Sequence, residues 1–149
     1  MVYIMNNIHD QVIAHWIENK NICEKILHDM FDESFIPIKT LYMLEAIKIH
    51  GSACEYCKRF LYNDHINHQD NLYTNYCINC PLYIVTGSKC QDVNSVWSSV
   101  AWAKNKVKII LFYNSPSDAK YLITNLLTAI NRMVALLITV KKEFKQCSY

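Results

Sequence analysis

Residues 115–145, which read SPSDAKYLITNLLTAINRMVALLITVKKEFK, decide the fold. Ser115 and Pro116 make a strong helix start, and Asp118 completes a pattern like a capping box. Apolar residues then recur at helical spacing, which predicts that one side of this helix is buried. The predicted buried positions are Leu122, Leu126, Ile130, Met133 and Leu137. About thirty residues at about 1.5 Å each give a helix of about 45 Å, long enough to be the spine of a domain.

The same stretch is apolar enough to raise the question of a transmembrane helix. A stripe of polar or small residues runs along it at helical spacing: Thr124, Thr128, Asn131, Ala135, Thr139 and Lys142. Arg132 stands in the middle of the stretch, where a charge is costly in hydrocarbon. The sequence therefore favours an amphipathic core helix, and we expect no membrane association.

Further helices are predicted on the N-terminal side of this stretch. Apolar stripes over residues 8–17 and 23–31 predict one bent helix or two short ones. Pro37 suits a first helical position, and Gly51 can end the helix that follows in a left-handed conformation. A third pattern runs from about Ser95 to Leu111 before the sequence around Pro116 breaks it.

Glycine is rare in the chain, with only two among 149 residues. This argues against a β-rich fold with many tight turns and against a glycine-rich phosphate loop. We therefore expect a mainly α fold, a helical bundle with a long C-terminal helix and an inserted metal-stapled Cys-rich loop. It should be a single domain over residues 1–149, with N-terminal helices in 1–50, a Cys-rich metal-binding segment in 51–92 and C-terminal helices in 93–149.

Two C-x-x-C pairs carry the clearest chemistry, Cys54 with Cys57 and Cys77 with Cys80. This spacing is typical of tetrahedral sites in which four thiolates bind one metal ion, and Cys90 is a fifth candidate ligand. A bound ion would let a segment with little core of its own hold a fixed shape. Seven cysteines are an odd count, and no secretory signal is visible, so we expect a reducing, cytoplasmic setting instead of a disulfide framework.

The sequence leaves the ligand set open. Cys90 could replace either member of the second pair, and a mixed site could include a histidine: His50, His65 or His68. Cys23 and Cys147 are interpreted as ordinary residues. Tetrahedral thiolate suits zinc, which is the preferred ion, with iron or an iron–sulfur cluster as the alternative.

The cysteines belong to a longer pattern of three short motifs. These are Cys54-Glu55-Tyr56-Cys57, Cys77-Ile78-Asn79-Cys80-Pro81 and Thr86-Gly87-Ser88-Lys89-Cys90. The pattern resembles that of uncharacterised small proteins of phages and bacteria, written CxxC, CxxCP and TGxxC. This chain departs from it in a longer spacer, residues 63–75. The resemblance implies a metal-stapled fold, a phage-like origin and hence the cytoplasm of a host cell, and it implies no particular activity.

Charge is unevenly distributed along the chain, which is +2 as a whole. Residues 1–53 carry −3, residues 54–92 carry −1 and residues 93–149 carry +6. One interpretation is that the acidic first third packs beside the basic last third. The other is a basic surface for nucleic acid or an acidic partner.

Three functions follow from these patterns. The leading one is a noncatalytic zinc-stabilised binding protein with a protein partner, such as a phage protein engaging a host factor or defence complex. A closed site of four cysteines leaves no position for an activated water, so we expect no enzyme. The second is nucleic-acid binding, with Trp97, Trp102 or Tyr113 for stacking. Its phosphate contacts would come from Lys104, Lys106, Lys108, Lys120, Arg132, Lys141, Lys142 and Lys145. The third is a redox or iron–sulfur protein that uses the C-x-x-C thiols.

Overall fold

A computed structural model describes residues 2–31, 36–50, 53–59, 80–113 and 116–147. Within these ranges the chain forms helices and no strand, so the prediction of a mainly α fold is confirmed. The helices are α1 (Val2–Phe31), α2 (Pro37–Glu45), α3 (Glu55–Cys57), α5 (Pro81–Thr86), α6 (Val96–Phe112) and α7 (Pro116–Cys147).

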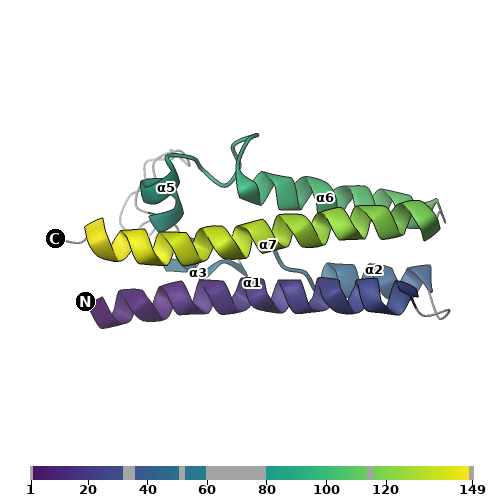
Figure 1. The fold of residues 1–149 in the computed structure, drawn as a ribbon, viewed down its shortest axis with the longest axis horizontal. Coiled ribbons are helices and arrows are strands. Elements are labelled where there is room, and N and C mark those ends of the chain that lie inside the picture. The colour runs from purple at the N-terminus through teal and green to yellow at the C-terminus, as the bar shows by residue number, and fades with distance from the viewer. Residues whose placement is uncertain (1, 32–35, 51–52, 60–79, 114–115, 148–149) are drawn as a thin grey trace.

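The two long helices α1 and α7 lie side by side along the whole length of the molecule (Figure 1). At one end α6 packs on α7, and α2 packs against both α1 and α6, which makes a four-helix arrangement. At the other end α3 contacts α1 and α5 contacts α7, near both chain termini. The bundle is therefore built from long helices at one end and from short helical turns of the Cys-rich segment at the other.

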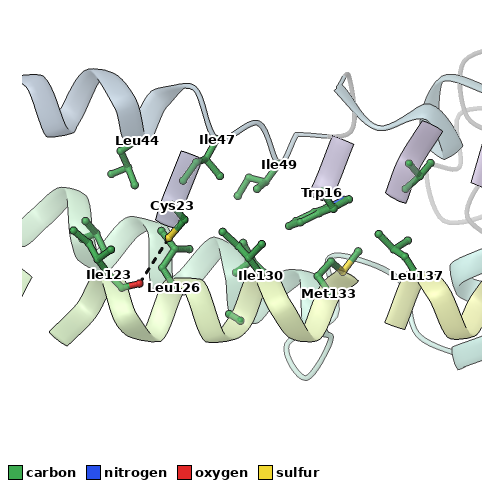
Figure 2. Close-up of a cluster of buried hydrophobic side chains, with 14 of the residues drawn as sticks. Trp16, Cys23, Leu44, Ile47, Ile49, Ile123, Leu126, Ile130, Met133 and Leu137 are labelled. Atoms are coloured by element: carbon green, nitrogen blue, oxygen red, sulfur yellow. Dashed lines mark hydrogen bonds between the residues drawn. The ribbon is translucent and has the colours of Figure 1, made fainter. Parts of the chain in front are cut away.

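The core lies between α7 and the elements that face it, as Figure 2 shows. Four of the five positions predicted to be buried on α7 are buried: Leu126, Ile130, Met133 and Leu137. Leu122 is half-buried, packs against the core and lines a cavity between α6 and α7. The predicted polar stripe is exposed at each of its six positions, from Thr124 to Lys142. The amphipathic pattern therefore set the orientation of α7 correctly, while its proposed cap Ser115 lies outside the described residues.

Helix α1 is continuous over 30 residues. It passes through Asn19, a polar residue that is only 1% exposed. The side-chain amide of Asn19 donates to the backbone oxygen of Lys48 (3.0 Å) and accepts from the backbone nitrogen of Lys48 (3.1 Å). A buried polar group is tolerated when it is hydrogen-bonded in this way. Asn19 thus fastens α1 to the segment after α2.

That segment, residues 46–50, corrects the prediction that the second helix continues to Gly51, because α2 ends at Glu45. Its backbone oxygens accept from side chains of other helices: Lys104 Nζ donates to Ile47 (2.9 Å) and Trp97 Nε1 to Ile49 (2.8 Å). Ile47 and Ile49 are themselves buried in the core. Since these contacts replace helical hydrogen bonds, the chain can leave the helix at Glu45 with its backbone oxygens still satisfied.

Candidate metal centre

The first C-x-x-C motif folds into a tight turn around the Cys54 sulfur. Cys54 is the N-cap residue of α3. Its sulfur accepts hydrogen bonds from the Cys57 thiol and from the backbone N–H groups of Cys57 and Tyr56. These donors stabilise the thiolate and, with the Cys57 thiol as the largest contributor, lower the pKa of Cys54 to about 7. The pair therefore has the geometry that a thiolate ligand requires.

The other described cysteines of the motif lie within electrostatic range of this pair. The pKa of Cys57 is raised, first by its hydrogen bond to Cys54, then by burial, and further by negative charge on Cys54, Cys90 and Cys80. Four thiols from three separate parts of the chain thus share one neighbourhood. Thiolates that raise one another's pKa repel, and a divalent cation among them would relieve that repulsion.

Cys80 is positioned by α5, a short helix that the sequence did not predict. Cys80 is its N-cap residue and is only 9% exposed, and Pro81 takes the first helical position. Gly87 ends the helix in a left-handed conformation (φ 72°), and its N–H donates to the Tyr83 oxygen at 2.7 Å. A Cβ there would meet no atom within 4 Å, so the positive φ and not space requires glycine. Glycine at this point turns the chain toward Cys90.

Cys90 is held by the start of α6. Its backbone oxygen accepts from the Ser95 hydroxyl at 2.5 Å and from the Ser98 hydroxyl at 3.0 Å. Ser95 also caps α6, because its hydroxyl accepts from the Ser98 backbone nitrogen at 3.0 Å. The same residues that begin the helix therefore fix the backbone of the candidate ligand.

Tyr56 joins the cysteine turn to the long helices. It is fully buried, and its hydroxyl hydrogen-bonds Nδ1 of His9 on α1. His9 in turn makes edge contacts with the rings of Tyr56 (5.5 Å between centroids) and of Phe144 on α7 (5.3 Å). Burial, followed by negative charge on Cys80 and Cys54, raises the pKa of Tyr56, so it remains neutral. Sequence reasoning missed both residues, although His9 lies beside Ile8 and Val12 in the apolar stripe of α1.

The described residues stop short of a complete coordination set. Within the ranges that the structure describes, no three or more His, Cys, Asp or Glu side chains are grouped as metal ligands. Cys77, His65 and His68 lie outside those ranges, and His50 is exposed. Among the cysteines whose side chains the structure describes, none forms a disulfide: Cys23, Cys54, Cys57, Cys80 and Cys90. The structure thus brings Cys54 and Cys57 into contact and Cys80 and Cys90 into their neighbourhood, while a single shared ion stays a prediction.

Cys23 behaves as an ordinary core residue. It is fully buried between α1 and α7, where its thiol contacts the backbone oxygen of Ile123 at 3.8 Å (Figure 2). Burial raises the pKa of the Cys23 thiol to about 12, so it remains protonated. Its chemistry is that of a small apolar side chain.

Several of the lysines expected to contact phosphate are used inside the molecule. Lys104 is only 8% exposed, and burial lowers its pKa. Lys108 pairs with Glu45, and its hydrogen bond lowers the pKa of that carboxyl, while Lys141 pairs with Asp10. Both pairs join the acidic first third of the chain to the basic last third. Lys104 is therefore not part of a basic surface, while Lys108 and Lys141 already have acidic partners within the protein. Nucleic-acid binding by the other cations stays a prediction.

Helix α7 also passes a test of length and composition for a membrane span. Residues Ser117–Phe144 are long and apolar enough to cross a membrane: an 18-residue window within them has a mean hydropathy of 1.6, and 39% of that window is buried inside the protein. The core helix of a soluble protein passes the same test. The polar stripe and Arg132 lie on its exposed side, where a charge is costly in hydrocarbon. The absence of membrane association stays a prediction.

Comparison with known proteins adds no relative: no family model, no curated protein and no solved structure matches this chain.

Proposed function

We propose that the protein is a noncatalytic binding protein whose Cys-rich segment is stapled by one thiolate-bound metal ion, with zinc preferred over iron. The observation that carries this proposal is the placement of Cys54, Cys57, Cys80 and Cys90 at backbone positions fixed by α3, α5 and the start of α6. Cys54 and Cys80 are N-cap residues of short helices, and serine hydroxyls at the start of α6 hold the backbone of Cys90. Fixed backbone positions of this kind support a structural site. In the simplest set Cys77 would be the fourth ligand beside Cys54, Cys57 and Cys80, and Cys90 is the alternative ligand.

The proposed metal ion would stabilise the folded Cys-rich segment. The described parts of the segment contribute few residues to the core, chiefly Tyr56, Cys80 and Leu82. Small units with little core of their own depend on a metal to remain folded. In this protein the metal would hold α3 against α1 and α5 against α7 at the end of the bundle near the termini.

A protein partner is supported by the opposite end of the bundle. The last turns of α1 and α6 and the first turns of α2 and α7 lie there (Figure 1). Large apolar side chains are exposed on the helices around them: Phe31, Ile36, Ile38, Tyr42, Ile109, Phe112, Tyr113 and Tyr121. Exposed apolar side chains that gather in one region of a surface can mark a site of interaction with another protein. A host protein, met in the cytoplasm by a phage-encoded chain, fits the resemblance of the cysteine motif.

A thiol–disulfide exchange assay separates this function from the redox alternative. The metal-loaded protein is expected to show no exchange activity, because metal-bound thiolates are unavailable for attack on a disulfide. Insulin reduction in the presence of a thiol reductant measures that activity. Exchange by the protein as purified that is lost in Cys54→Ser and kept in Cys23→Ser would replace the proposal with a redox function.

A further inference from the structure

A second site is formed by the long helices, away from the cysteines. A cavity of about 250 Å³ lies between α6 and α7. Its polar and aromatic lining consists of Ser99, Trp102 and Lys106 from α6 and Asn125, Thr128 and Arg132 from α7. The remaining lining residues are Ala103, Leu122 and Ala129, so no carboxylate borders it. The α6–α7 groove is therefore positively charged and open to an anion.

The two cations of this groove are not engaged by internal carboxylates. Lys108 and Lys141 of the same helices form ion pairs, whereas the described residues give neither Lys106 nor Arg132 such a pair. Lys106 instead lies over the ring of Trp102, with Nζ 5.5 Å from the ring centroid. Both cations are exposed. They can bind an external anion without breaking an ion pair of the fold, and Lys106 would do so from its place beside Trp102.

Trp102 differs from the other two tryptophans. Trp16 is buried in the core, and the Trp97 ring nitrogen donates to the Ile49 oxygen. Trp102 is 62% exposed at the edge of the groove. This is a large apolar surface to leave in water, and a flat indole face beside two cations suits a flat, negatively charged ligand.

We propose that the α6–α7 groove binds single-stranded nucleic acid, with a base stacked on Trp102 and phosphates on Lys106 and Arg132. Stacking requires an unpaired base, which favours a single strand over a duplex. The hydroxyl and amide groups of Ser99 and Asn125 can hydrogen-bond base edges or sugars. An acidic peptide would satisfy the cations but would leave Trp102 without a planar partner.

Charge-neutralising variants test the phosphate contacts. The probe is a fluorescein-labelled oligothymidylate of about twelve nucleotides, followed by anisotropy at several salt concentrations. Lys106→Gln with Arg132→Gln should weaken binding about tenfold, and it should flatten the slope of log affinity against log salt by about 1.4, at about 0.7 per phosphate contact. The matched control, Lys25→Gln with Lys142→Gln, changes the net charge equally at exposed positions outside the groove and should lose far less.

Tryptophan fluorescence tests the stacking. Adding unlabelled oligothymidylate should quench the protein, and Trp102→Leu should abolish that quenching and weaken binding by about tenfold or more. An equal loss of affinity in the groove and control variants would overturn the site, as would binding without quenching or no binding at all. Tight binding of polyglutamate with no response to the oligonucleotide would assign the groove to an acidic protein instead. Metal content measured on each variant keeps this result separate from the metal proposal.

Discussion

Cys57→Ser is expected to lose the bound zinc and to destabilise the protein more than Ile130→Ala or Cys23→Ser. Structural zinc contributes on the order of 10 kcal/mol in small domains, and a serine hydroxyl is a poor replacement for a thiolate ligand. The loss should concentrate in α3 and α5, because the long helices keep their own core. Urea unfolding and elemental analysis of the purified variant measure the two effects.

The matched control is Cys23→Ser, the same change at a thiol buried between α1 and α7. It should lower stability through loss of packing and burial of a hydroxyl, and it should retain one equivalent of zinc. Loss of metal in both variants would show that the ion depends on the fold as a whole. Retention of metal in Cys57→Ser would remove Cys57 from the ligand set.

Ile130→Ala is expected to lower the free energy of unfolding by about 2–5 kcal/mol, because it leaves a cavity in a packed core. Ile130 is fully buried on α7 and faces the residues of α1 and of segment 46–50 that Figure 2 shows. Ile138→Ala makes the same change on the same helix at a side chain that is 53% exposed. Ile138→Ala should lower the free energy of unfolding by about 0.5 kcal/mol or less. Chemical denaturation compares the two, and equal losses would contradict the packing of α7.

The long helices could be predicted from the sequence because their signals are local. The spacing of Leu126, Ile130 and Met133 defines one buried side of α7, and Ser95 marks the start of α6. A helical period needs only the residues within the helix itself. The turn between Cys54 and Cys57 could be predicted for the same reason, because the C-x-x-C spacing is a local signal.

The parts that could not be predicted depend on contacts between distant residues. The early end of α2 rests on Asn19, Trp97 and Lys104, which bond segment 46–50 from two other helices. Lys104 carries the same charge as its neighbours and gives no sign in the sequence that it is buried. His9 and Tyr56 meet across 47 positions of sequence. Only the fold shows which polar residues are buried inside the protein. It also shows which cations, such as Lys106 and Arg132, are exposed and can bind a ligand.

X-ray absorption at the zinc edge on the purified protein tests the central claim most directly. The account predicts one equivalent of zinc with a shell of four sulfur atoms at about 2.3 Å. A histidine ligand would add a nitrogen at about 2.0 Å. That result would change the ligand set but would leave a structural metal site in place. Protein that is folded and free of both zinc and iron, with Cys54 and Cys57 joined in a disulfide, would contradict it.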